Sequence, residues 1–372
     1  MRKERNFAIL LSFIVFLLTW SYYSYFSEAL NDDLWEDING FTRIIIPDTF
    51  IYRNVVDFSN PFTSIVFAGI KNSIGPSFIW YMTNNQWVFV LFVNAVILYV
   101  ELMYIAKTAQ FFNIPRRKTL SIMILIALLP DTLYYSVGAL KEIPTLALMS
   151  GFFYHYLKYE RIKWLLCVFL LIIFRYQIGF ALLLFLLADI FNKRSFRFAF
   201  LFLIFISALF PLIQNFGVFY NNTTELFREQ NGVGSSLGGG VELIRDKIPV
   251  ISIFAILIRI IQSIFEPFFY LFRNFTFFED ENLSIINVVL FLSSVFLFSY
   301  WLSFLKRIGS LLLHPSFVSR DIMRLYLLCL VVLVPTAGFS FIHHRYLYPI
   351  TSLIILATIV YPKHMKDVKI DP

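Results

Sequence analysis

The stretch WLLCVFLLIIFRYQIGFALLLFLLADI, residues 164–190, decides the fold. It is apolar except for Arg175, Gln177 and Asp189. As a single helix rising about 1.5 Å per residue it would be about 40 Å long, longer than the hydrocarbon core of a bilayer, which is about 30 Å thick. That helix would also place Arg175 near the middle of the membrane, at a cost of at least about 2.5 kcal/mol.

The residues that flank this stretch favour a hairpin instead. Lys163 precedes it and Lys193-Arg194 follow it, and basic clusters favour the cytoplasmic side of a membrane. If both ends are cytoplasmic, Arg175 lies at the outer turn. The arms 164–174 and 176–190 are short for full spans. We therefore expect Arg175 to be recessed below the outer surface, inside protein, where it needs a partner.

The composition indicates a membrane protein along the whole chain. The 372 residues have a mean hydropathy of +0.73, with 59% hydrophobic and 15% charged residues. We predict an all-α polytopic integral membrane protein, with residues 1–372 forming a single transmembrane domain. The net charge of +7 follows from Lys and Arg gathering in the predicted cytoplasmic segments, so no nucleic acid is expected as a partner. Cys167 and Cys329 both lie within apolar spans, so no disulfide framework is implied.

About ten transmembrane helices are expected, with both termini in the cytoplasm. The predicted spans are 7–26, 86–106, 119–130, 143–157, 164–174, 176–190, 197–214, 283–305, 325–342 and 346–362. Two long outer loops, 27–85 and 215–282, are expected to hold amphipathic or re-entrant helices. The apolar run 250–265 in the second loop is one of these, because a crossing there would move Lys306-Arg307 to the outer side.

Three predicted hairpins bring charged side chains to the outer face. Asp131, Lys141 and Glu142 lie at the turn of the hairpin 119–157, Arg175 at the turn of the second, and His343-His344-Arg345 at the turn of the third. Arginine and lysine that converge there suit a lipid-linked phosphate, because the arginine fork binds phosphate oxygens in pairs. A nearby histidine or carboxylate can take the proton of an attacking sugar hydroxyl. The pattern favours glycosyl transfer from a polyprenyl carrier.

Each of these residues also has a structural interpretation. Arg175 can pair with Asp131 or Glu142 as a buried ion pair. Arg345 and the two histidines can anchor the chain at the interface, and Lys141-Glu142 can be a solvated pair at a helix start.

An acidic group opens the first outer loop. Asp32 and Asp33 stand with Glu36 and Asp37 at a spacing that puts two carboxylates on one helical face. A solvated outer face and a base or metal role both remain open for Asp32 and Asp33. The two histidines lack the spacing of a zinc site, and we expect no cofactor and no bound metal.

Several stretches resemble a known family. They are DTFIYRNVVDF (48–58), GPSFIWYM (75–82), LLPDTLYYSVGALKEIP (128–144), RYQIGF (175–180) and HHRYLYPI (343–350). They are similar to stretches of the bacterial O-antigen and capsule repeat-unit polymerases, and more loosely of the GT-C class of membrane glycosyltransferases. The arginine-to-glycine spacing of the polymerases occurs here between Arg53 and Gly69.

The resemblance implies inverting sugar transfer from an undecaprenyl-diphosphate-linked glycan on the periplasmic face of the bacterial inner membrane. By that analogy Arg175 and Arg345 hold the diphosphate, with His343 or His344 as base, and a chain-length regulator is a further partner. An acidic pair in the first outer loop is usual in the GT-C class, so Asp32-Asp33 keep a polyprenyl-phosphate sugar transferase as the alternative. A lipid-linked glycan flippase or transporter is the third hypothesis.

Overall fold

The computed structural model describes most of the chain as helices. The described residues are 1–27, 53, 74–138, 140–193, 195–214, 285–313, 318–338 and 347–368. Every regular element within these ranges is helical, which confirms the predicted all-α class. The chain divides into two compact units, which are described separately.

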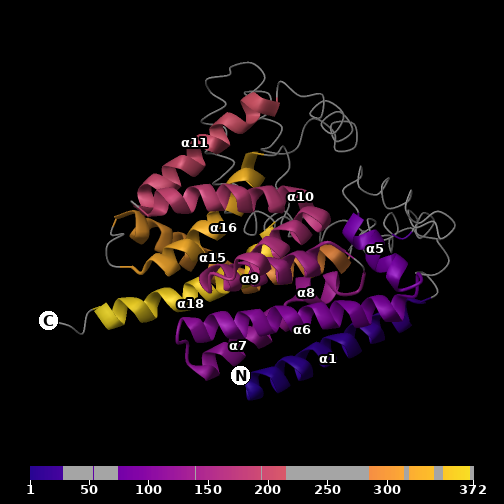
Figure 1. The fold of residues 1–372 in the computed structure, drawn as a ribbon. Helices are drawn as coiled ribbons and strands as arrows, with labels where there is room; N and C mark the ends of the chain where they lie inside the picture. The colour runs from indigo at the N-terminus through magenta and orange to yellow at the C-terminus, as the bar shows by residue number, and fades with distance from the viewer. Residues whose placement is uncertain are drawn as a thin grey trace, which may run out of the picture. The chain divides into compact units, whose positions relative to one another are not determined.

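Unit 1 comprises Met1–Phe180, Phe268–Leu305 and Tyr348–Pro372. Its elements are α1 (Arg2–Tyr25), α5 (Ile74–Met82), α6 (Trp87–Phe111), α7 (Arg116–Leu128), α8 (Pro130–Tyr135), α9 (Glu142–Leu157), the 3-10 turn η4 (Tyr348–Ile350) and α18 (Thr351–Val368). The first parts of α10 (Arg161–Asn192) and α15 (Ile285–Leu313) also belong to it. Its most extensive helix contacts are those of α6 with α1 and with α9 (Figure 1).

Unit 2 comprises Ala181–Pro267 and Lys306–Leu347. Within it α11 (Phe196–Gln214) packs along α16 (Arg320–Gly338), and the later parts of α10 and α15 complete the described portion. Arg197 of α11 donates hydrogen bonds to the backbone carbonyls of Leu312 and Leu313 at the end of α15, at 2.5 and 2.8 Å. These carbonyls have no partner within their own helix, so the arginine caps α15.

Helix α6 buries several polar residues and exposes a face of apolar ones. Asn94, Glu101 and Thr108 recur every seventh residue and are buried. Apolar side chains at helical spacing on the other face, such as Phe89, Phe92 and Val96, are exposed. Water would favour the reverse arrangement, whereas lipid favours this one. Among the described residues, four helical stretches are long and apolar enough to cross a membrane: Arg2–Tyr25, Trp87–Phe111, Arg161–Asn192 and Val295–Leu313.

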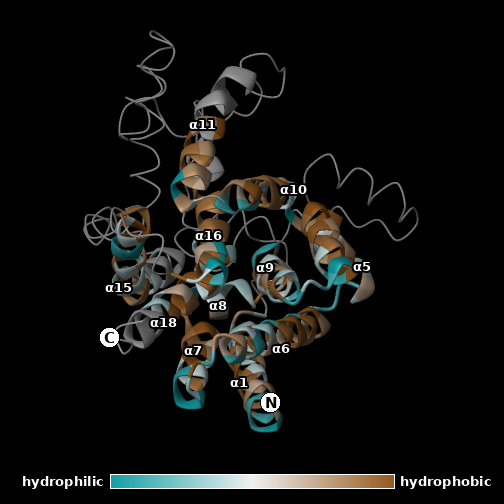
Figure 2. Cartoon of the chain, turned by 60° about the vertical axis from the view of Figure 1, so that its left-hand side comes forward, coloured by the Kyte–Doolittle hydropathy of each residue, from teal (hydrophilic) through white to brown (hydrophobic). Residues whose placement is uncertain are grey.

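The two ends of the unit 1 helices differ in chemistry. At one end Tyr23 stacks on Trp87, whose ring centroid also lies 4.8 Å from that of Trp80, and aromatic clusters of this kind mark a membrane interface. At the other end Glu4 of α1 pairs with Arg116 of α7 at 3.1 Å. Figure 2 shows hydrophilic residues at the labelled N-terminal end of α1 and at one end of α7. The predicted orientation makes this end cytoplasmic.

The helix boundaries agree with much of the span prediction. Over 119–157 the structure has two helices, α7 and α9, with the short α8 between them, close to the predicted arms 119–130 and 143–157. In the outer loop 27–85, the nine-residue helix α5 is described, and at about 13.5 Å it is too short to cross a bilayer. The loop 215–282 lies outside the described residues. The count of about ten spans and the cytoplasmic termini stay predictions.

Candidate functional site

Arg175 interrupts helix α10. Its backbone is extended (φ −159°, ψ 84°) between two helical segments, so the predicted break at this residue is confirmed. A Cβ atom on Gly179 would lie 3.1 Å from the Cα atom of Ile172. Seven residues of straight helix would separate the two positions by about 10.5 Å. The chain therefore bends sharply at Arg175, and only a glycine at position 179 permits so close an approach.

Glu142, the first residue of α9, pairs with Arg175. The distance from Arg175 Nη1 to Glu142 Oε1 is 3.7 Å, and the two side chains are 4% and 0% exposed. This distance exceeds that of a charge-assisted hydrogen bond, about 2.7–2.9 Å. The carboxylate stabilises the buried guanidinium by charge without fixing it in a short hydrogen-bonded fork.

Lys141 and Asp131 are buried in the same unit, at 8% and 0% exposure. The solvated alternative for Lys141-Glu142 is therefore wrong. The pair begins a helix that is packed inside unit 1 rather than exposed at its end. Asp131 follows Pro130 in the first turn of α8, and its backbone N–H donates to the hydroxyl of Ser293 at 2.9 Å.

A buried polar cluster surrounds Tyr348. Its hydroxyl is hydrogen-bonded to that of Thr132 at 2.8 Å. The carboxyls of Asp131, Glu142 and Glu101 all lie close enough to interact with it electrostatically. Two of these three acids were predicted to gather at one place. Glu101 was not assigned to that site, although a lone carboxyl in an apolar span is itself a signal.

Helix α5 lies beside the break in α10. A Cβ on Gly75 would lie 2.3 Å from the ring of Phe174, the residue before Arg175. Arg53 places its guanidinium 5.9 Å from the ring centroid of Trp80, on the same helix. This is a cation–π contact. The arginine predicted by family spacing thus lies against the helix that contacts the Arg175 turn.

The remaining predicted site residues lie outside the described residues. They are Asp32, Asp33, His343, His344 and Arg345. The structure therefore brings together Glu142 and Arg175, buries Lys141 and Asp131 in the same unit, and places Arg53 beside α5. In the described ranges no three His, Cys, Asp or Glu side chains are grouped to hold a metal ion.

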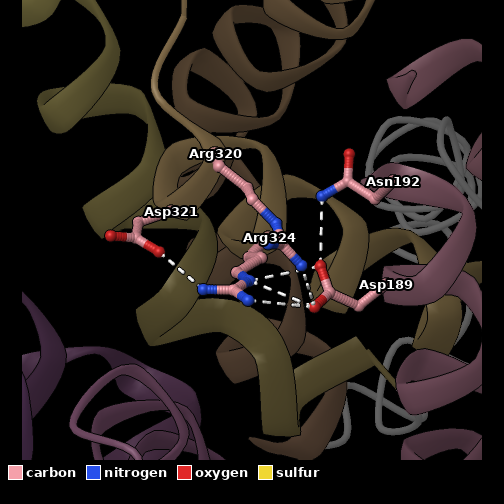
Figure 3. A network of polar contacts seen from close by, with 5 residues as sticks. All are labelled: Asp189, Asn192, Arg320, Asp321 and Arg324. Carbon is pink, nitrogen blue, oxygen red and sulfur yellow. Dashed lines mark hydrogen bonds and ion pairs between the residues drawn. The ribbon is translucent and has the colours of Figure 1, made fainter. Parts of the chain in front are cut away.

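Unit 2 holds a second buried ion network, shown in Figure 3. Arg324 contacts both carboxylate oxygens of Asp189 through Nε at 3.2 Å and Oδ2 through Nη2 at 3.1 Å. Arg320 donates to the same carboxylate at 3.0 Å, Asn192 donates to it at 3.2 Å, and Asp321 accepts from Arg324 Nη1 at 2.8 Å. This network was not predicted from the sequence, although Asp189 is one of the three polar residues in the apolar stretch 164–190.

The two buried arginines differ in how their charge is held. Arg324 has two acids at hydrogen-bonding distance, so its network is electrically balanced and suited to holding helices together. Arg175 lies at a helix break, and the Glu142 carboxylate is 3.7 Å from its guanidinium. Lys141, the residue before Glu142, is also buried. In a low-dielectric interior such a cation interacts strongly with an anionic group. No family model, curated protein or solved structure matches the chain.

Proposed function

We propose that this chain is a bacterial inner-membrane glycosyltransferase that joins undecaprenyl-diphosphate-linked oligosaccharide repeat units into a surface polysaccharide. The observation that carries the proposal is Arg175, a buried arginine at a helix break, with Glu142 at 3.7 Å. Ionisable side chains at membrane depth are generally functional, and a guanidinium suits the diphosphate of a lipid carrier.

The reaction needs positive charge where the leaving group forms. A hydroxyl oxygen of the acceptor sugar attacks the anomeric carbon of the donor, and the bond from that carbon to the diphosphate oxygen breaks with inversion. The diphosphate leaves with the bonding electrons, and a base takes the proton of the hydroxyl. Arg175 and Lys141 stabilise the charge on the diphosphate, and Glu142 positions Arg175. By family analogy His343 or His344 is the base and Arg345 a second diphosphate ligand.

Removing the two charges of the pair together distinguishes the proposed function from a purely structural ion pair. Arg175→Ala leaves Glu142 as an uncompensated buried carboxylate, so it reduces both folding and product. The double variant Arg175→Ala with Glu142→Gln removes both charges. We expect it to accumulate in membranes near the wild-type level while making no long polysaccharide. The measurement is the chain-length ladder on a gel, in a strain that lacks the chromosomal copy.

The single variant Glu142→Gln is the matched control, since it retains Arg175. We expect it to make polymer at a reduced rate. If the double variant makes polymer of normal length, Arg175 is structural and the site assignment is wrong. If the deletion strain keeps its long chains, the polymerase function itself is wrong.

A polyprenyl-phosphate sugar transferase of the GT-C class is the second candidate, favoured by the acidic pair Asp32-Asp33 in the first outer loop. In this transferase Arg175 would bind the monophosphate of the polyprenyl-phosphate sugar donor. The two functions differ in the product of the deletion strain. Loss of a polymerase leaves single repeat units on the lipid, whereas loss of a transferase changes the sugar composition or the side branches.

A further inference from the structure

Helices α6 and α9 meet along a row of polar side chains that the proposed transfer reaction does not use. Glu101 of α6 is fully buried, and its Oε1 accepts a hydrogen bond from the hydroxyl of Ser150 of α9 at 2.9 Å. Ser150 in turn lies 3.2 Å, oxygen to oxygen, from Ser352 of α18. Three helices thus enclose one carboxyl group.

Nothing in the described part of the chain balances a negative charge on Glu101. No lysine, arginine or histidine there forms an ion pair with it, and its Oε2 atom accepts no hydrogen bond. Burying an isolated carboxylate inside a membrane protein is energetically unfavourable. A proton on the carboxyl group removes that cost.

The next turn of the same interface carries groups that transfer protons. Tyr104, three residues after Glu101, packs its ring against Gly151, which follows Ser150. The Tyr104 hydroxyl lies 3.2 Å from His155 Nε2. Glu101 and Tyr104 are therefore neighbours, three residues apart, on the face of α6 that meets α9.

The row ends in the turn between α9 and α10, on the side predicted to be cytoplasmic. His155 Nδ1 lies 2.5 Å from Glu160 Oε2, and the Glu160 side chain is 38% exposed. The Lys163 ammonium at 3.1 Å and the hydrogen bond with His155 lower the pKa of Glu160 below its ordinary value. Glu160 is thus a partly exposed, charged carboxylate that contacts both solvent and the imidazole of His155.

We propose that the α6–α9 interface is a proton path that connects solvent at Glu160 to the carboxyl group of Glu101. A proton taken up by Glu160 moves to His155 Nδ1, while the proton on Nε2 moves to the Tyr104 hydroxyl oxygen. Tyr104 then releases its own proton toward Glu101, and the imidazole returns to its first tautomer. Each relay group gains and loses one proton, and Glu101 alone gains one. Rows of Glu and His are the usual form of proton relays in membrane proteins.

Other ionisable groups of unit 1 lie beside this path. Tyr348 of η4 interacts electrostatically with Glu101, and also with Asp131 of α8 and Glu142 of α9. Around Tyr104 and His155 the ionisable groups are Lys107 of α6, Tyr154 of α9, and Cys167 and Lys163 of α10. The two lysines discourage an extra positive charge on His155, which suits an imidazole that passes protons on and does not retain them.

Infrared spectroscopy of the full chain in lipid nanodiscs tests the path without using glycosyl transfer. We expect a carbonyl band from a protonated carboxyl group that disappears in Glu101→Gln. After transfer into heavy water, the shift of this band reports proton exchange at Glu101. His155→Gln keeps a hydrogen-bonding side chain but cannot relay a proton. We expect it to slow the exchange by about 100-fold, the low end for a positioned proton-transfer group.

Gly151→Ala tests the same path without removing a titratable group. An added Cβ would lie 2.9 Å from the Tyr104 ring, so the ring must move and exchange must slow. Gly309→Ala, where no atom lies within 4 Å, is the matched control and should exchange at the wild-type rate. The proposal is overturned if Glu101→Gln retains the band, or if His155→Gln and Gly151→Ala both exchange as fast as wild type. Should Glu101→Gln fail to accumulate, the exchange rates of the other two variants decide the question.

Discussion

Removing the Asp189 carboxylate should destabilise unit 2 more than removing any nearby charge. Asp189 and Arg324 are 3% and 4% exposed, and three N–H···O contacts of 3.1–3.2 Å join them. Breaking a buried ion pair by removing one partner typically costs about 3–5 kcal/mol, because the other charge remains buried. In Asp189→Ala, Arg324 keeps its 2.8 Å contact with the partly exposed Asp321. We therefore expect about 3 kcal/mol, the low end of that range.

Two comparison variants make this magnitude specific. Arg320→Ala removes a contact of 3.0 Å to the same carboxylate, but the Arg320 side chain is 38% exposed. Exposed pairs contribute about 0–1 kcal/mol, so its effect should be small. The double variant Asp189→Leu with Arg324→Leu buries no charge and should recover most of the stability lost in Asp189→Ala.

The assay is equilibrium unfolding of the purified chain in mixed detergent micelles, followed by tryptophan fluorescence. The free energy of unfolding should be highest for wild type, slightly lower for Arg320→Ala and lowest for Asp189→Ala. If Asp189→Ala loses no more than Arg320→Ala, the network contributes no more than an exposed pair. If the double leucine variant is less stable than Asp189→Ala, uncompensated charge is not the cause of the loss.

Two further predictions concern packing and pH. Gly75→Ala should destabilise the chain by about 1–3 kcal/mol, because its Cβ would meet the Phe174 ring at 2.3 Å. Gly309→Ala lies in open space within α15, so in the same assay it should raise the free energy of unfolding by about 0.5–1 kcal/mol. Folding lowers the pKa of Glu160, so the charged Glu160 side chain stabilises the folded protein. This stabilisation is present above the unfolded Glu pKa of about 4.3 and is lost as the pH falls through the pKa of Glu160 in the folded protein. Unfolding midpoints measured from neutral to acid pH should show this loss in wild type and less of it in Glu160→Gln.

The sequence predicted the helical class and the break at Arg175 because both follow from local signals. Apolar runs bounded by basic residues set the helices, and one arginine in such a run requires an interruption. The polar turn between 119–130 and 143–157 likewise predicted the two helices α7 and α9, but not the short helix α8 between them.

These local signals do not predict which residues far apart in the sequence contact one another. Whether Arg175 faces Glu142 or Asp131, and whether Arg324 faces Asp189 across 135 positions of sequence, depends on how helices pack. Charge sorting assigns a residue to one side of the membrane but does not distinguish a solvated cation from a buried one. Arg324 and Lys141 both stand near the ends of apolar runs, and both are buried.

The contrast between the two buried arginines bears on why Arg175 is the better candidate for a ligand. A guanidinium offers five N–H donors, and Arg324 directs its donors at two carboxylates within 3.2 Å. An anionic ligand at Arg324 would have to displace these acids. At Arg175 the Glu142 carboxylate lies at 3.7 Å, which is longer than the paired hydrogen bonds of a fork. Under the proposed function, a phosphate oxygen would approach the guanidinium more closely than this carboxylate does, and the buried Lys141 next to Glu142 adds a second positive charge in the same unit. A carboxylate at this distance stabilises the cation by charge without holding it in a fork, which is what a site proposed to bind and release a lipid diphosphate in each cycle requires.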